Sequence, residues 1–200
     1  MTCRFLALFA TLGLAACVSA PTHYYTLVPT ANGARATGAV APFQFEMQPV
    51  LIPVQVDQPQ VVVRLNSGAL SILETERWSA PLADEFHDAL ANQLELRLGT
   101  RNLEGLPKVS DRPVVSLQTD VRRFDSVPGQ YALIDVVWSL SRRVSTEPRR
   151  SLTCSSTLRQ PAGAQVQDVI MAHQQVIAQL AAVIAGTART WAQDPGVGCP

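Results

Sequence analysis

The residues best suited to covalent chemistry in this 200-residue chain are its cysteines, of which there are four. A thiol can be acylated, oxidised to a disulfide or used as a metal ligand, and its surroundings decide among these. The sequence contains no CxxC pair and no four-ligand zinc spacing, so neither a redox motif nor a structural zinc site is indicated. Each thiol therefore has to be judged from its own context: Cys3, Cys17, Cys154 and Cys199.

Cys17 ends the tetrapeptide Leu14-Ala15-Ala16-Cys17, which closes an apolar run that begins at Phe5. The run has about ten residues and follows a single Arg4, whereas a membrane-spanning helix needs ~20, so residues 1–16 are predicted to be a signal peptide. Two small residues before a cleavage site and a cysteine directly after it resemble the bacterial lipobox, in which the cysteine sulfur receives a diacylglycerol. Cys17 is therefore the expected lipidation site. The alternative is an ordinary signal peptide with a chance cysteine at the cut.

The lipobox also predicts where the mature chain is located. Lipoproteins that stay at an inner membrane usually begin with a motif that resembles Cys-Asp, whereas here Val18 and Ser19 follow the cysteine. We therefore expect an outer-membrane protein that is lipid-anchored through residues 17–23 and faces the periplasm. In that oxidising compartment Cys154 and Cys199 could form a disulfide, although sequence separation alone leaves the distance between them open.

Catalytic motifs are absent from the sequence. It has no GxSxG elbow, no HExxH helix and no glycine-rich phosphate loop, so we expect no enzyme, no catalytic or metal-binding residue and no cofactor. The histidines are dispersed: His23 lies in the tether, His87 is expected to face solvent, and His173 is expected to be a hydrogen-bonded core residue. The acids near His87 are attributed to helix capping and solubility rather than to a metal site.

Charge is sparse and balanced, with 16 basic and 16 acidic residues that make up 16 % of the chain. The low charge together with an apolar fraction of 47 % excludes a disordered chain, and the balance of charges argues against a nucleic-acid partner, which requires a surplus of cations. If residues 114–124, 131–143 and 151–159 form an antiparallel meander, however, five arginines gather at one end of the sheet. These arginines could form a docking surface for an acidic partner or for anionic lipid headgroups. The alternative is that they are merely solvated side chains at turns. They are Arg112, Arg142, Arg143, Arg149 and Arg150.

The elements that position these residues can be predicted from periodicity. β-branched runs separated by turn residues predict a hairpin of residues 60–64 and 69–74 ahead of the meander. Leucines that recur every four residues predict a helix that is capped by Ser79 and ends at Gly99. A longer apolar stripe predicts a helix over residues 165–192.

The expected fold is one α/β domain over residues 24–200. It consists of a mixed β-sheet sandwiched between helices, with a long C-terminal helix. Residues 131–143 carry apolar side chains on both faces, so we expect them to form a central strand that is covered on both sides.

Several segments together resemble the ABC-type transport auxiliary lipoprotein family, which includes the lipoprotein of the paraquat-inducible envelope system. The most specific are Tyr24 and Tyr25 after the tether, and Arg77 and Trp78 followed by Pro81 before the first predicted helix. We expect Trp78 to pack in the core, Arg77 to pair with an acid or stack on Trp78, and the tyrosines to lie on a first strand. The sequence departs from the family pattern at Val56-Asp57, where a longer Tyr-Leu-Asp run is shortened, and in its cysteine-containing tail.

The resemblance implies a non-enzymatic protein that works with an ABC transporter and a mammalian-cell-entry (MCE) subunit in lipid transport between the two membranes. The expected partners are that MCE-domain subunit and the outer membrane, and a homo-oligomer is left open. One alternative is a periplasmic lipid- or ligand-binding lipoprotein with an internal apolar pocket. Another is a lipoprotein hydrolase, which would require a Ser–His pair within hydrogen-bond reach in a cleft.

Overall fold

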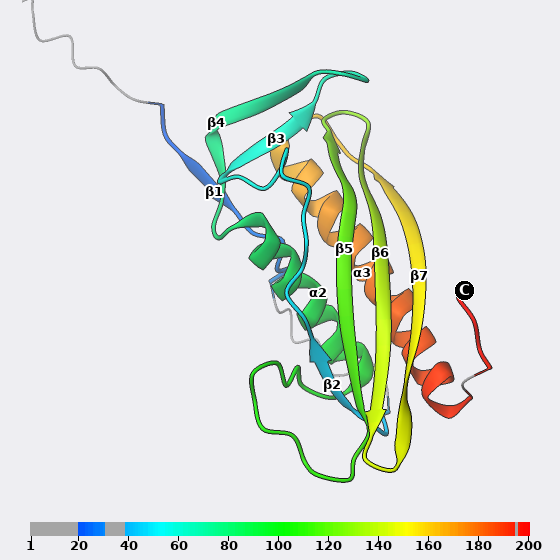
Figure 1. Ribbon diagram of the computed structural model, residues 1–200. Helices are drawn as coiled ribbons and strands as arrows, with labels where there is room; N and C mark the ends of the chain where they lie inside the picture. The colour runs from blue at the N-terminus through cyan, green and yellow to red at the C-terminus, as the bar shows by residue number, and fades with distance from the viewer. Residues whose placement is uncertain (1–19, 31–38, 195) are drawn as a thin grey trace, which may run out of the picture.

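The computed structural model describes residues 20–30, 39–194 and 196–200. Within these ranges the chain forms seven strands and two helices (Figure 1). In chain order they are β1 His23–Tyr25, β2 Gln44–Met47, β3 Gln60–Arg64, β4 Leu70–Trp78, α2 Leu82–Leu98, β5 Val114–Val127, β6 Tyr131–Val144, β7 Glu147–Pro161 and α3 Val166–Gln193.

The strands form two sheets rather than the single sheet that we expected. The larger sheet has the order β2-β5-β6-β7 and contains the predicted antiparallel meander, to which β2 adds in parallel alongside β5. The smaller sheet has the order β1-β4-β3, with the predicted β3–β4 hairpin antiparallel and β1 parallel to β4. The mixed α/β class and the long C-terminal helix are confirmed.

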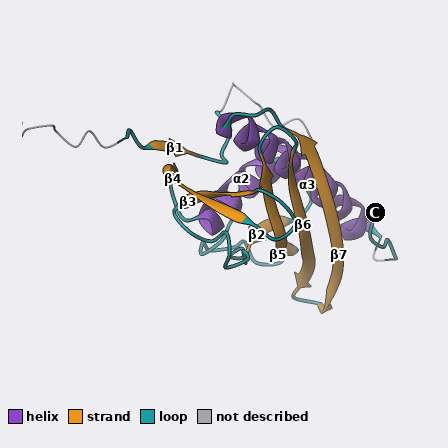
Figure 2. Ribbon diagram, turned by 90° about the horizontal axis from the view of Figure 1, so that it is seen from above, coloured by secondary structure: helices purple, strands orange, loops and turns teal. Residues whose placement is uncertain are grey.

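Both helices lie on the same face of the larger sheet (Figure 2). Phe124 on β5 shows this directly, because its ring contacts Phe86 of α2 at 6.5 Å and stacks on His173 of α3 at 3.9 Å between ring centroids. The opposite face of the central strand β6 continues from Val137 to Ser139 and Ser141, all partly exposed. We expected this strand to be covered on both faces, but within the described residues helices cover one face only. The serine hydroxyl groups make the second face compatible with water.

The helix boundaries follow local sequence signals. Gly99 ends α2 with a left-handed backbone (φ 64°), and Gln165 and Asp168 form a capping box at the start of α3. Ser79 does not cap α2 as expected, because Pro81 occupies the N-cap position. α3 is long and apolar enough to cross a membrane by length and composition, but 56 % of its most apolar window is buried. It is therefore the core helix of this domain.

The domain has two distinct ends, separated by the length of β5. The fourteen residues of this strand span about 45 Å at ~3.4 Å per residue. Near its C-terminus Asp125 binds Arg64 of the β3–β4 hairpin at 2.9 Å, and Trp78, which pairs with β1, contacts Phe124. We call this the anchor-proximal end, because β1, the strand closest in sequence to the expected anchor at Cys17, lies there. We call the other end, where β5 begins and β6 turns into β7, the basic end.

Candidate functional site

The lipidation site cannot be described geometrically, because residues 1–16, Cys17 and the beginning of the tether lie outside the described residues. The description of the chain starts at Ala20, and the chain enters the domain at β1 (Figure 1). The contacts of β1 therefore determine how a lipid anchor at Cys17 would be attached to the folded domain.

The motif residues of the first strand meet those before α2. In the parallel pairing of β1 with β4, Tyr24 lies opposite Arg77 and Tyr25 opposite Trp78. Trp78 is buried and packs edge-to-face on Phe124, as expected for a core residue. Among the described residues no carboxylate forms an ion pair with Arg77, and its guanidinium does not stack on Trp78, so neither contact expected of this side chain is found there.

Glu76, the residue before Arg77, makes the polar side-chain contacts between β1 and β4. Its carboxylate accepts a hydrogen bond from the Tyr25 hydroxyl at 2.6 Å and lies 3.0 Å from the His23 Nδ1 atom. The hydrogen bond to Glu76, followed by burial, raises the pKa of Tyr25 to about 12. The same hydrogen bonds from Tyr25 and His23 lower the pKa of the Glu76 carboxyl. The charged carboxylate thus holds β1 against β4 within the smaller sheet.

A second carboxylate, Glu85 in the first turn of α2, binds the chain directly after β1. Its Oε2 atom accepts hydrogen bonds from the Thr26 hydroxyl at 2.7 Å and the Leu27 backbone N–H at 2.8 Å. Its Oε1 atom accepts one from the Ser79 hydroxyl at 2.5 Å. Glu85 is buried, and all of these donors are neutral. A carboxylate satisfied in this way at a helix N-terminus is a strong structural tie between the entering chain and the domain.

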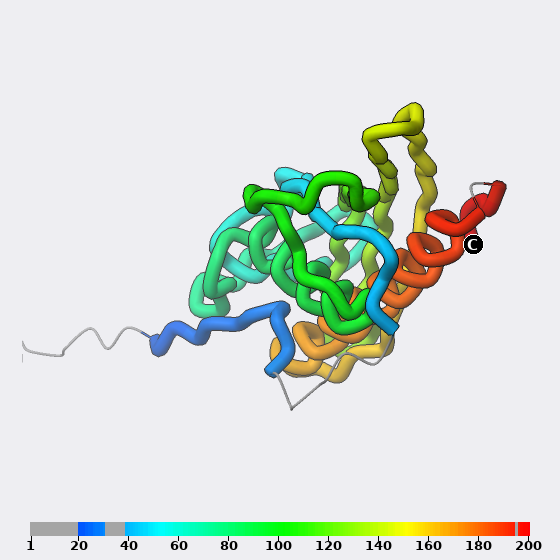
Figure 3. Tube along the Cα trace, turned by 90° about the horizontal axis from the view of Figure 1, so that it is seen from below, coloured from blue at the N-terminus to red at the C-terminus, as the bar shows by residue number. Residues whose placement is uncertain are grey.

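The basic end brings together all five arginines that the meander predicted. Arg142 on β6 lies opposite Arg150 on β7. Arg143 lies opposite Val114, which begins β5 and follows Arg112 by two residues. Arg142 is bound to Glu147 at 2.6 Å, and the Arg149 guanidinium donates to the Ser141 hydroxyl at 2.6 Å. Seen from this end, the β6–β7 turn projects from the body of the domain (Figure 3).

Sequence analysis missed two members of this end, Lys108 and Glu46. The Lys108 ammonium lies 2.6 Å from the buried Glu46 carboxylate, which also accepts a hydrogen bond from Ser116. Burial alone would raise the pKa of Glu46, but Lys108 and Ser116 outweigh it and lower the pKa overall. With Lys108 there are six cations against Glu46, Asp111 and Glu147, so the basic end carries a net charge of +3.

A polar hollow of about 410 Å³ opens beside these charges on the helix-free face of the larger sheet. Glu46, Arg143 and Arg149 line it together with the sheet serines Ser116, Ser139, Ser141 and Ser151. Such a lining suits contacts with a polar or anionic group rather than an acyl chain. It does not favour the alternative of an internal apolar lipid pocket.

A Ser–His pair does exist, between Ser126 on β5 and His173 on α3, with 2.9 Å between Oγ and Nε2. Both side chains are buried, at 1 % and 0 % exposure, and His173 Nδ1 has no hydrogen-bond partner in the described part of the chain. A hydrolytic pair needs access for substrate and a group that orients the base. The pair matches the expected core histidine and gives no support to the hydrolase alternative.

His173 makes the stability of the domain depend on pH. Burial lowers its pKa from 6.5 to about 3, so the folded state keeps the imidazole neutral while the unfolded chain binds a proton below pH 6.5. The folded state therefore keeps its full stability with respect to His173 above pH 6.5, and it loses stability progressively as the pH falls from 6.5 toward 3. Between about pH 7 and pH 5, urea unfolding should show the wild type losing about 2 kcal/mol more stability than the His173→Gln variant. Equal losses would contradict this assignment.

Among the described residues, no three His, Cys, Asp or Glu side chains are grouped so that they could hold a metal ion. Glu85 points inward to Thr26 and Ser79 rather than serving solubility. His87 is also less exposed than expected: 18 % of its side chain is accessible, and it lies 3.1 Å from Asp88 and 2.8 Å from Glu104.

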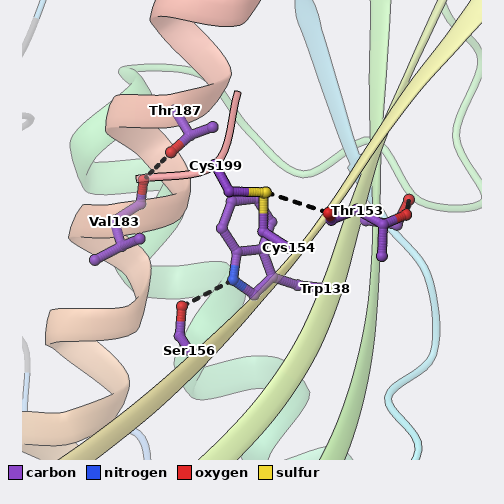
Figure 4. The surroundings of a disulfide bond; sticks show 8 residues. Trp138, Thr153, Cys154, Ser156, Val183, Thr187 and Cys199 are labelled. Atoms are coloured by element: carbon purple, nitrogen blue, oxygen red, sulfur yellow. Dashed lines mark hydrogen bonds between the residues drawn. A yellow bond between two sulfur atoms is a disulfide. The ribbon is translucent and has the colours of Figure 1, made fainter. Parts of the chain in front are cut away.

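The C-terminal tail is attached to β7 by a disulfide between Cys154 and Cys199 (Figure 4). Their Cα atoms are 5.6 Å apart, within the usual range for a disulfide. Cys154 lies opposite Trp138 on β6, whose indole N–H donates to Ser156 at 3.0 Å. The tail therefore returns from the end of α3 and covers the helix-facing side of the sheet next to a buried tryptophan.

Comparison with known proteins agrees with the fold. The sequence profile of the ABC-type transport auxiliary lipoprotein components matches residues 25–185. No curated protein shows significant sequence similarity to the chain. An uncharacterised protein of known structure is 17 % identical, with a TM-score of 0.61 over 84 % of this chain and 99 % of that one.

Two further structures come from named organisms. A protein from Xanthomonas campestris assigned to the DUF330 family is 19 % identical, with a TM-score of 0.56 over 88 % of this chain and 100 % of that one. The rare lipoprotein B from Shewanella oneidensis is 9 % identical over 56 % of this chain and 91 % of that one, but its TM-score of 0.36 is too low to support an argument. The first two similarities concern the fold alone.

Proposed function

Because the chain belongs to the family of ABC-type transport auxiliary lipoprotein components, we propose a specific role for it within such a system. The protein is a non-enzymatic outer-membrane lipoprotein subunit of an MCE-type system that transports lipids between the two membranes. It faces the periplasm and docks onto, or caps, the periplasmic MCE assembly. Its lipid anchor is Cys17.

The placement of the two ends is the observation that carries this proposal. The chain enters at the anchor-proximal end, where Glu76 and Glu85 bind it to the domain. The basic end lies about 45 Å away along β5, so an anchored domain presents it toward the periplasm. A net-positive surface held at that distance from the membrane is suited to an acidic partner surface, because complementary charge steers association.

The anchor is tested by replacing Cys17 with serine. Acylation requires the thiol of Cys17, and each acyl methylene that enters the bilayer stabilises membrane binding by ~0.8 kcal/mol. The Cys17→Ser protein is therefore expected to leave the outer-membrane fraction. Fractionation by density gradient measures this, with Cys3→Ser as a matched control that changes a cysteine of the predicted signal peptide. A Cys17→Ser protein that stays in the outer-membrane fraction would show that something else anchors it.

The docking surface is tested by replacing Arg142, Arg143, Arg149 and Arg150 with serine. Exposed charges accelerate association and are screened over ~8 Å at physiological salt, so the variant should associate more slowly, by about tenfold at low salt, and with a weaker salt dependence. Co-purification and association rates with the tagged periplasmic part of the cognate MCE subunit provide the measurement. Arg122→Ser, an exposed arginine outside the basic end, is the control.

The outcomes separate the partner from the surface. If the intact protein forms no complex, the MCE partner is wrong. If the variant forms a normal complex with unchanged salt dependence, the partner stands but the basic end is not the docking surface. A loss of equal size in Arg122→Ser would show a general charge effect rather than a local one.

A further inference from the structure

We infer that the anchor-proximal end is itself a membrane-contacting surface, in which the β3–β4 hairpin rests on a phospholipid bilayer. Its exposed apolar side chains enter the bilayer interface, and the guanidinium groups of Arg64 and Arg123 face the headgroup phosphates. The inference rests on the proposed lipidation of Cys17 and adds to it a defined orientation of the domain.

The first argument is the reach of the tether. Cys17 and His23 are six residues apart, and an extended chain spans at most ~3.6 Å per residue, so the anchor lies within about 22 Å of β1. β1 pairs with Glu76–Trp78, the C-terminal end of β4, and the same strand carries Ile72 and Leu70 about 14–20 Å before Glu76, at ~3.4 Å per residue. The contacts of Glu76 and Glu85 fix the chain to the domain directly after the tether, at Tyr25 and Thr26. The smaller sheet is therefore the part of the domain nearest the membrane.

The second argument is the exposure of large apolar side chains on that sheet. Tyr24 is 66 % exposed, Leu65 64 %, Ile72 46 % and Leu70 40 %. Leu65 and Leu70 lie on either side of the hairpin turn, and Tyr24 is on the neighbouring strand. Leucine and isoleucine gain from leaving water, and tyrosine is favoured at the membrane interface because one end is apolar and the other polar.

The third argument is a hollow of about 530 Å³ between the β3–β4 turn and the β5–β6 turn. Arg64 and Arg123 line it, together with the polar side chains of Asn66, Ser67, Gln130 and Tyr131. Both arginines bind the buried Asp125, at 2.9 and 2.5 Å, which leaves one net positive charge. Each guanidinium has five N–H donors, so donors remain for a phosphate next to the apolar hairpin.

The orientation can be measured with a nitroxide label at Ser67→Cys in the mature lipidated protein, reconstituted in phosphatidylethanolamine–phosphatidylglycerol vesicles. Collision with oxygen, which concentrates in the bilayer, is compared with collision with a water-soluble nickel complex. The label at residue 67 is expected to show at least a twofold higher oxygen-to-nickel ratio than a matched label at Ser145→Cys in the β6–β7 turn. Omitting phosphatidylglycerol should lower the ratio at residue 67, and Arg123→Gln should reduce that lipid dependence.

The apolar contribution is tested with Leu65→Ser, Leu70→Ser and Ile72→Ser combined, all at exposed positions where folding should persist. This variant should lose most of the difference between the two labels, whereas Leu106→Ser with Val109→Ser, exposed residues near the basic end, should keep it. Equal ratios at residues 67 and 145 in vesicle-bound protein would overturn the inference and leave the anchor intact. A protein that fails to float with vesicles would instead overturn the proposed lipidation.

Discussion

Replacing Ile177 with aspartate is expected to lower the free energy of unfolding by about 3–5 kcal/mol, because it places an unpaired charge in the core. Ile177 lies in the middle of α3 and is fully buried. The cluster between α3 and the larger sheet is apolar, and the buried His173 one helical turn earlier is kept neutral by its burial, so a carboxylate at residue 177 must either stay charged without water or be protonated at a cost. Natural domains are stable by about 5–15 kcal/mol, so the loss would be a large fraction of the total.

Urea unfolding followed by circular dichroism measures this loss. Gln175→Asp is the matched control, since it adds the same carboxylate to the same helix at an exposed position. The control should change stability by less than about 0.5 kcal/mol. An unchanged midpoint for Ile177→Asp would contradict the burial of this face of α3.

The elements that sequence analysis predicted well are those with a strong local period. The apolar stripe of α3 and the alternation in β5 and β6 are each longer than ten residues, so a few exceptions do not obscure the pattern. The gathering of the arginines followed from the same reasoning. Once tight turns join three antiparallel strands, Arg112, Arg143 and Arg149 have to lie at the same end of the sheet.

The parts that could not be predicted depend on contacts between residues far apart in the sequence. β2 joins β5 across about seventy residues of chain, and β1 joins β4 across about fifty, so local patterns carry no record of either pairing. Glu85 illustrates the same limit at the level of one side chain. An acid in the first turn of a helix is usually solvated, and the arrival of Thr26 and Leu27, 59 and 58 residues away, explains its burial.

Removing the disulfide by Cys154→Ser with Cys199→Ser is expected to lower the free energy of unfolding by about 3–4 kcal/mol. Joining two residues 45 positions apart restricts the unfolded chain, and the loss of that restriction favours unfolding. Changing both cysteines avoids a free thiol that could react elsewhere. Because Cys154 is buried opposite Trp138, the tail should also loosen over the tryptophan, which would shift its fluorescence toward longer wavelength.

Reduction supplies the internal control for this prediction. Dithiothreitol should lower the urea midpoint of the wild type toward that of the double variant and leave the variant itself unchanged. Ser155→Ala, at an exposed position next to Cys154, should behave as the wild type does, because it alters the strand without touching the cross-link. A wild-type midpoint that does not respond to reduction, while mass spectrometry shows both thiols free, would mean that folding already holds the tail in place and that the cross-link adds no stability.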